Sequence, residues 1–231
     1  MPSLNTPGVV LSRRDFGESG RLALVYTEEL GKTWVKFSGV NMLGRKMKAF
    51  SETLVWCEYR FHITPGAGYA KATGGNLISS FPNIRKNLEA TAEALVYCEL
   101  LSALTVLNSP SFGKYSLITE ALEALDSFGS IPWMPSAFGL RFLELAGYGV
   151  REKFPFEDED GDGMAPLLWE ALYQASWESL KEIPFDPSRA REIKNLVEGR
   201  VEEETHRTLR APLFVEALKK FSVQEEHLVP C

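Results

Sequence analysis

The sequence is poor in cysteine and histidine and has no long apolar run. Its 231 residues include 3 Cys and no more than 3 His. Cys57, Cys98 and Cys231 lack the paired spacing of a zinc site, and their odd number does not suit a disulfide framework. We therefore expect free thiols in a reducing cytoplasm. No segment approaches the ~20 apolar residues of a membrane-spanning helix, and the first residues lack the pattern of a secretory signal. We expect a soluble protein with no membrane segment.

Charge is unevenly distributed along the chain. The 25 Lys and Arg against 31 Asp and Glu give a net charge of −6, which on average argues against nucleic-acid binding. Residues 1–80, however, hold 10 basic and 6 acidic residues, a net charge of +4, whereas residues 81–231 hold 15 and 25, a net charge of −10. A surface that binds nucleic acid is therefore expected only in the first 80 residues.

The periodicity of apolar residues also changes near residue 80. Before it, short segments rich in β-branched and aromatic residues alternate with glycine, which predicts five strands at residues 9–12, 22–27, 33–37, 54–63 and 69–78. Residues 28–31 form the predicted turn between the second and third strands. Five short strands in about 70 residues favour a small barrel or sandwich such as an OB-fold.

After residue 80 the pattern is helical. Six helices are predicted at residues 84–107, 114–128, 135–146, 165–181, from Asp186 or Ser188 to about 210, and 212–221. Leu88, Ala92, Leu95 and Leu101 mark the apolar face of the first helix, and Gly147 is the expected C-cap of the third. The fold class is therefore α+β: an N-terminal five-stranded OB-fold barrel, residues 1–80, followed by an all-α domain, residues 81–231.

Two motifs have simpler interpretations. Asp158, Asp160 and Asp162 resemble the first half of a calcium-binding EF-hand loop, but Trp169 occupies the position of the required twelfth-position carboxylate. We therefore expect a solvated acidic loop at residues 157–163, and weak cation binding by this loop is left open. The glycine-rich residues 66–75 match no known phosphate-binding spacing, and a β-hairpin is the expected structure.

Nothing in the sequence suggests catalysis. The three histidines, at positions 62, 206 and 227, are far apart, and none lies near a nucleophile motif. Because a nucleophile, a base and an oxyanion donor cannot be assembled, we expect neither an enzyme nor a cofactor.

Basic residues interleaved with aromatic residues are the strongest candidates for a site. Such a surface attracts phosphate through charge and stacks bases on its rings. The alternative is that these cations only solvate the surface. The candidate DNA-binding residues are Arg13, Arg14, Arg21, Lys32, Trp34, Lys36, Arg45, Lys46, Lys48, Arg60 and Lys71.

Several segments, in order, resemble the bacterial recombination mediator family RecO. They are the opening strand at residues 8–11 with the stretch 13–19, the second strand and turn at 22–32, Gly39, the helix ending in Gly-Tyr at 138–149, and the stretch 210–214. The resemblance implies an OB-fold followed by a helical domain, and a non-catalytic function. Members bind single- and double-stranded DNA, anneal strands, partner RecR, engage the tail of single-stranded DNA-binding protein and help to load RecA. It also implies a nucleoid-associated protein of the bacterial cytoplasm.

The sequence departs from the RecO pattern at three places. Many members carry a four-cysteine zinc site where this chain has the cysteine-free residues 150–163, so no zinc is expected. Ser38 and Asn41 stand where basic residues are common, which predicts weaker or differently placed DNA binding. Ser136 and Ala137 replace basic residues that suit an acidic partner tail.

Two alternatives stay open. Leu140, Arg141 and Leu143 could line a groove for a partner peptide, or the two leucines could be core residues. The whole chain could instead be a protein–protein adaptor with an OB-like domain that no longer binds DNA.

Overall fold

The computed structural model describes residues 3–40, 47–156 and 164–211. The chain divides into two compact units. The first comprises residues 1–82 with 105–123, and the second comprises residues 83–104 with the chain from 124 onward. Residues 105–123, which the sequence assigns to the helical half, thus group with the barrel. The division into domains 1–80 and 81–231 stays a prediction.

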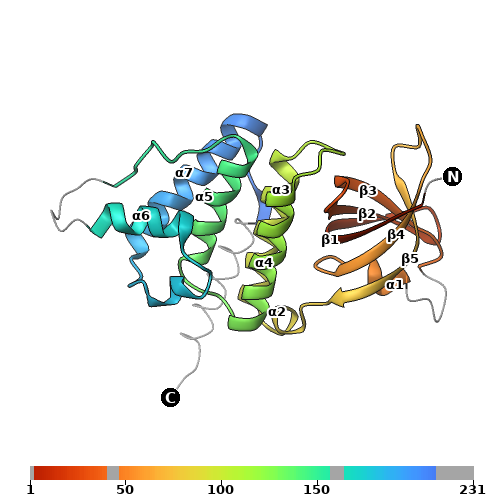
Figure 1. Ribbon diagram of the computed structural model, residues 1–231, viewed down its shortest axis with the longest axis horizontal. Coiled ribbons are helices and arrows are strands. Elements are labelled where there is room, and N and C mark those ends of the chain that lie inside the picture. The colour runs from red at the N-terminus through yellow and green to blue at the C-terminus, as the bar shows by residue number, and fades with distance from the viewer. Residues whose placement is uncertain (1–2, 41–46, 157–163, 212–231) are drawn as a thin grey trace, which may run out of the picture. The chain divides into compact units, whose positions relative to one another are not determined.

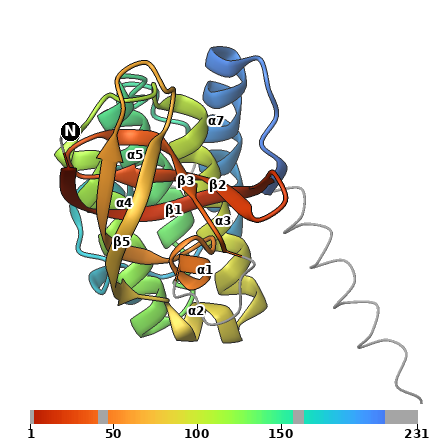
Figure 2. The same ribbon diagram turned by 90° about the vertical axis from the view of Figure 1, so that its right-hand side faces the viewer.

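The first unit contains a closed barrel of five strands, β1 (Ser3–Phe16), β2 (Gly20–Thr27), β3 (Gly31–Phe37), β4 (Trp56–Ile63) and β5 (Ala70–Ser79) (Figures 1 and 2). The strand order is β1-β2-β3-β5-β4, and β4 pairs with β1 to close the sheet. Among the five strands of the described residues, β3 and β5 form the one parallel pair. A short helix, α1 (Met47–Phe50), precedes β4. This is the five-stranded barrel expected of an OB-fold.

Alternation along the strands builds the barrel core. Val35 and Phe37 of β3 and Tyr59 and Phe61 of β4 point inward and are fully or almost fully buried. Their neighbours in sequence therefore point outward, because successive side chains of a strand face opposite sides of the sheet. The outward set includes Lys36 of β3 and Arg60 of β4.

All five predicted strands are present, and the first is longer than predicted. β1 extends to Phe16, four residues beyond the predicted end at Ser12. The predicted turn between β2 and β3 is confirmed, and Gly31 adopts a left-handed φ of 65° there. The glycine-rich residues 66–75 belong to the antiparallel β4–β5 hairpin, as predicted.

The helices are α2 (Pro82–Lys86), α3 (Leu88–Leu104), α4 (Phe112–Phe128), α5 (Met134–Ala146), α6 (Met164–Gln174) and α7 (Pro187–Thr205), with a 3₁₀ turn η1 (Ser179–Glu182). The boundary between the two units falls within α4. In the second unit α5 contacts α3, α6 and α7, and Figure 1 shows it among them. Phe138, Leu140, Phe142 and Leu143 of α5 are completely buried.

Capping residues explain the helix ends. Asp186 accepts hydrogen bonds from the backbone N–H groups of Ser188 and Arg189 and starts α7. Gly147 ends α5, as predicted, with a φ of 85°; its N–H donates to the Glu144 carbonyl, and the Tyr148 N–H donates to the Leu143 carbonyl.

Three predicted helices differ from the structure. The predicted helix 84–107 is interrupted, because the Asn87 side chain accepts from the Ala90 N–H and caps a new helix. Leu88, predicted on its apolar face, is exposed. The predicted helix 165–181 ends at Gln174 and is followed by η1, and the fifth ends at Thr205 because His206 is left-handed.

Some predictions lie outside the described residues. They are the helix at 212–221 and the acidic loop at 157–163 with its EF-hand resemblance. Within residues 3–40, 47–156 and 164–211, no three His, Cys, Asp or Glu side chains gather as metal ligands would. None of the helices in these ranges has the length and apolar character needed to cross a bilayer.

Candidate nucleic-acid interface

Three cations lie in one row across the outer surface of the barrel. Arg14 of β1 pairs with Leu22 of β2, Leu22 pairs with Lys36 of β3, and Lys36 pairs with Lys71 of β5. Directly paired residues present their side chains on the same face of a sheet. Arg14 and Lys71 are exposed and Lys36 is half-buried. We call Arg14, Lys36 and Lys71 the cation row.

Aromatic rings accompany the cation row. The Arg14 guanidinium lies 5.1 Å from the centre of the Trp34 ring. The Lys36 ammonium lies 4.9 Å from the Phe16 ring and 5.8 Å from the Tyr69 ring. Phe16 and Tyr69 themselves meet edge to face at 6.1 Å. This surface therefore combines positive charge with partly exposed rings, the two features that suit a single-stranded nucleic acid.

Phe16 was not among the sequence candidates. It follows Arg14 by two residues, so both side chains emerge on the same face of β1. The prediction ended the strand at Ser12, and an alternation extended by four residues could have found Phe16. Phe37, by contrast, is aromatic and close in sequence but is fully buried in the barrel core.

Arg21 does not belong to the interface, and its predicted DNA contact is wrong. Its side chain is buried and donates to the Ser51 hydroxyl and the Glu52 carboxylate, both at 2.8 Å. Arg13 pairs with the same carboxylate at 2.9 Å. Arg21 thus stabilises the connection between β2 and the segment after α1, and Glu52 neutralises charge that the sequence assigns to DNA.

Lys32 lies apart from the cation row. It lies at the opposite end of β3 from Lys36, and its backbone carbonyl accepts a hydrogen bond from the Asn108 N–H at 2.8 Å. The side chain is buried, and burial lowers the pKa of its ammonium group. Its small exposed surface makes a phosphate contact unfavourable, and the contact of Lys32 with DNA stays a prediction.

For the other predicted DNA contacts, the structure gives only a general position. Arg60 is exposed on the outer face of β4, two residues from His62, which pairs with Lys71. Lys48 is exposed on α1. Arg45 and Lys46 lie outside the described residues, and their contact with DNA stays a prediction.

The predicted peptide groove around α5 is wrong. Leu140 and Leu143 are completely buried, so the alternative that they are core residues is confirmed. The Arg141 guanidinium donates to the carbonyls of Leu172 and Ala175, at 2.8 and 2.5 Å. It also lies 4.4 Å from the centre of the Trp177 ring. Arg141 therefore caps the C-terminal end of α6, which favours a positive charge.

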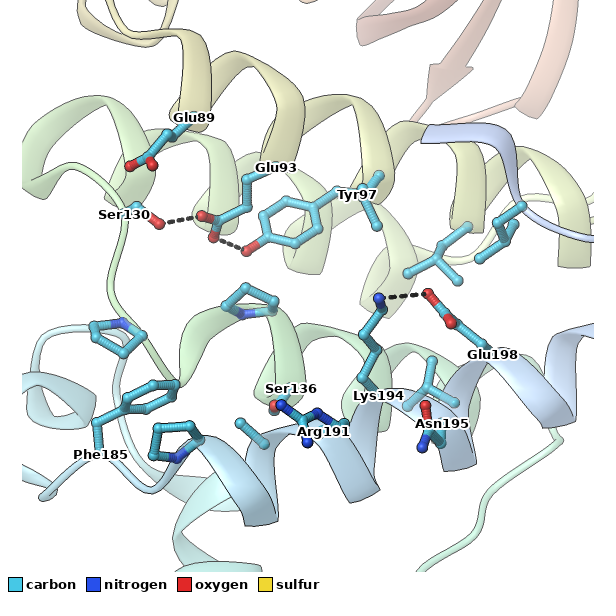
Figure 3. Close-up of a pocket in the computed structure, with 18 residues that line it drawn as sticks. Glu89, Glu93, Tyr97, Ser130, Ser136, Phe185, Arg191, Lys194, Asn195 and Glu198 are labelled. Carbon is cyan, nitrogen blue, oxygen red and sulfur yellow. Dashed lines mark hydrogen bonds and ion pairs between the residues drawn. The ribbon is translucent and has the colours of Figure 1, made fainter. Parts of the chain in front are cut away.

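A different cavity, of ≈ 640 Å³, lies in the second unit (Figure 3). α3 and α7 form its two walls, and the beginning of α5 contributes Ser136. The Glu93 carboxylate on α3 accepts hydrogen bonds from the hydroxyls of Tyr97 and Ser130. Burial and this carboxylate raise the pKa of Tyr97 well above its usual value.

The two walls of this cavity carry different charge. Glu89 and Glu93 lie on α3, whereas Arg191 and Lys194 lie on α7, where Lys194 is 3.8 Å from Glu198. Apolar lining comes from both helices and from the chain after α7, namely Val96, Leu100, Val197 and Leu209. The cavity is thus amphipathic, but it is not the strongly basic pocket that an acidic peptide would prefer.

The fold and the surface together define a class of protein. It is an OB-fold barrel with a cationic and aromatic outer face, followed by a helical unit. Comparison with known proteins identifies the family. The model of the recombination protein O N-terminal region matches residues 1–81, and that of its C-terminal region matches residues 85–153. The chain belongs to the recombination protein O (RecO) family.

Curated relatives agree with this assignment. The DNA repair protein RecO of Exiguobacterium sp. strain AT1b is 30% identical over 143 residues, which cover 61% of this chain and 55% of the relative. That of Clostridium perfringens is 26% identical over 152 residues, 65% of this chain and 61% of the relative. That of Bacillus subtilis is 29% identical over 119 residues, which cover 52% of this chain and 46% of the relative. The chain thus spans about half to three fifths of the length of these relatives.

Proposed function

We propose that this chain is a DNA-repair and recombination mediator that binds and anneals DNA through its barrel. With RecR, it would help to load RecA onto single strands coated by single-stranded DNA-binding protein. The role is non-catalytic and belongs to the nucleoid of a bacterial cytoplasm. The observation that carries the proposal is the cation row with its rings, because it offers phosphate and base contacts on one surface. Family membership and the names of the relatives support it.

The row accounts for binding without sequence preference. Each cation that pairs with a phosphate releases condensed counterions, and exposed rings stack on any base. Because Arg13 shares Glu52 with Arg21, and Lys32 is buried, only part of the basic charge of residues 1–80 is available to DNA. We therefore propose moderate affinity for single strands and weaker affinity for duplexes, whose bases are already stacked.

A matched pair of triple variants tests the proposal. R14A/K36A/K71A removes the cation row, and K86A/K153A/R207A removes three exposed cations of the second unit. Both change the net charge equally. Fluorescence anisotropy with a labelled single-stranded oligonucleotide at low salt should show about tenfold weaker binding for the first variant and little change for the second. Equal loss in both would show that net charge alone matters and would reject the site.

The alternative function is an adaptor that binds proteins but no DNA. The pairing of Arg13 and Arg21 with Glu52 favours it. A mobility-shift assay with the wild-type protein at low salt separates the two functions. A shift of single-stranded DNA at micromolar protein supports the mediator, and no shift supports the adaptor.

We also propose that the tail of single-stranded DNA-binding protein binds in the α3–α7 cavity. The acidic residues of the tail would face Arg191 and Lys194 of the cavity, and the apolar end of the tail would contact Val96 and Leu100. Glu89 and Glu93 on the opposite wall would oppose the acidic residues, so the affinity should be low. Anisotropy with an acidic, Phe-ended peptide tests this, and absence of binding at ~100 µM rejects it.

A further inference from the structure

A second surface lies at the other end of the β2–β3 strand pair, away from the cation row. The turn of this pair, at residues 28–30, is covered by the segment 105–111 of the same unit. The Asn108 N–H donates to the Lys32 carbonyl, and Leu107 forms an isolated β-bridge with Lys32. A Cβ atom on Gly31 would lie 2.2 Å from the Ser109 carbonyl oxygen, so the two backbones touch directly. The segment is therefore fixed against the barrel.

This fixed segment exposes three large apolar side chains. Val106 is 75% exposed, Leu107 44% and Phe112, at the start of α4, 68%. Single exposed apolar residues are ordinary, but here three lie within seven residues, and gathered apolar surface marks protein interaction sites. We call Val106, Leu107 and Phe112 the apolar patch. Because their backbone is already held, ordering them on a partner costs little conformational entropy.

Acidic residues border the apolar patch. Glu28 and Glu29 occupy the turn beneath it, and Glu29 is exposed. Both carboxylates lie close enough to Tyr115 of α4 to help burial raise the pKa of its phenol to about 12. The nearby cations, Lys32 and Lys114, are buried and half-buried. The exposed charge of this end is therefore negative, although residues 1–80 as a whole have a net charge of +4.

The two ends of the β2–β3 strand pair thus carry exposed charge of opposite sign. Lys36 pairs with Leu22 near one end of β2, and Glu28 follows the other end. Roughly 20 Å of strand separates them. Carboxylates repel phosphate, so DNA on the cation row does not extend favourably onto the acidic end. DNA bound to the cation row would therefore leave the acidic end accessible.

We propose that Glu28, Glu29, Val106, Leu107 and Phe112 form a docking surface for a protein partner that presents apolar side chains flanked by Lys or Arg. The inference rests on the proposed function, because a mediator must hold DNA and a partner protein together. It assigns the two tasks to opposite ends of one strand pair. RecR, the partner proposed above, is the probe that tests it.

The experiment measures binding of full-length protein to purified RecR of the same organism by calorimetry. V106S/F112S removes the apolar contact and E28K/E29K reverses the charge. M164S/L167S, two exposed apolar residues of α6, is the matched control. All six positions are on the surface, and circular dichroism checks that the variants fold. We expect at least tenfold weaker RecR binding for the first two variants and an unchanged value for the control.

Binding of a single-stranded oligonucleotide by V106S/F112S should stay within twofold of wild type. Unchanged RecR binding in both surface variants, or no RecR binding by the wild type, would overturn the docking surface. DNA binding through the cation row would stand in either case. If instead the wild type self-associates in sedimentation and V106S/F112S abolishes this, the surface belongs to a second copy of the chain, and the inference is wrong.

Discussion

At the scale of single residues, burial decides which arginines can act. Arg14 and Arg21 lie on neighbouring strands, yet Arg14 is exposed beside Trp34, whereas Arg21 is buried against Ser51 and Glu52. A buried guanidinium needs such partners, because removal of its hydration shell is costly. The same residue type therefore serves as a surface contact in one strand and as a structural link in the next.

Arg21→Ala should destabilise the barrel without touching the DNA surface. It removes one of the two arginines that pair with the half-buried Glu52 carboxylate, and the lost contacts should cost about 3 kcal/mol of unfolding free energy. Urea unfolding followed by tryptophan fluorescence measures this. Arg14→Ala, at an exposed position, should change stability by no more than about 0.5 kcal/mol. Equal destabilisation by both would contradict the structural role of Arg21.

The sequence could identify the cations but not their partners. Arg14, Trp34, Lys36 and Lys71 were predicted and lie together on one face. Arg21 and Lys32 could not be separated from them, because their burial depends on Glu52, Ser51 and residues 107–108, which are distant in sequence. Leu140 and Leu143 could not be assigned either, because both apolar core and apolar groove give the same helical pattern.

Buried cysteine and tyrosine side chains should lower the stability of the folded protein at alkaline pH. Burial raises the pKa of Cys57 from 9.0 to about 11, and those of Cys98 and Tyr26 from 9.0 and 10.0 to about 12. These pKa values are higher in the folded state, so the unfolded state loses its protons first and is favoured as pH rises. The stability contributed by these three groups should be fully present below about pH 9 and should be lost as the pH rises to about 12. Urea midpoints between pH 7 and 11 test this, and a flat profile would contradict it.

The same burial should make the thiols unreactive. In a Cys231→Ser variant only Cys57 and Cys98 remain, and both are buried. Because the thiolate is the reactive species, Ellman's reagent at pH 8 should titrate neither thiol in the native protein and both in denaturant. Rapid native reaction of either would show that its burial is wrong.

At the scale of elements, the ends of strands and helices were harder to predict than their existence. All five strands follow from alternation and apolar runs, but β1 continues through Arg13 and Arg14 because β2 supplies hydrogen-bond partners there. The predicted helix 84–107 is interrupted by the Asn87 cap. The sequence does not predict this interruption, because the segment contains no glycine or proline. Local signals are reliable where they include a geometric requirement, as at Gly147 and Asp186.

Two turn glycines allow a matched test of close packing. Gly31 and Gly66 both have left-handed φ values, 65° and 78°. A Cβ at Gly66 meets nothing within 4 Å, whereas at Gly31 it would lie 2.2 Å from the Ser109 oxygen. Gly66→Ala should therefore cost about 1 kcal/mol for backbone strain alone, and Gly31→Ala clearly more. Thermal unfolding compares them, and equal melting temperatures would mean that residues 105–111 do not pack on the turn.

At the scale of the whole molecule, charge separates the two halves of the chain. The net charge of −6 is the sum of +4 in residues 1–80 and −10 in residues 81–231. Within the first part, Glu52 is already counted in the net charge of +4, but its pairing with Arg13 and Arg21 makes these two arginines less available to phosphate. The positive surface that remains is the cation row and its exposed neighbours, so DNA affinity should depend on a small number of phosphate contacts.

The salt dependence of DNA binding measures that number. If the three cations of the row each neutralise one phosphate, the logarithm of single-strand affinity should fall with the logarithm of salt with a slope of about −2. Between 50 and 200 mM salt this is roughly a twentyfold loss of affinity. R14A/K36A/K71A should bring the slope close to zero. A wild-type slope much steeper than −2 that persists in this variant would place the main phosphate contacts elsewhere, with Arg45, Lys46 and Lys48 as the next residues to replace.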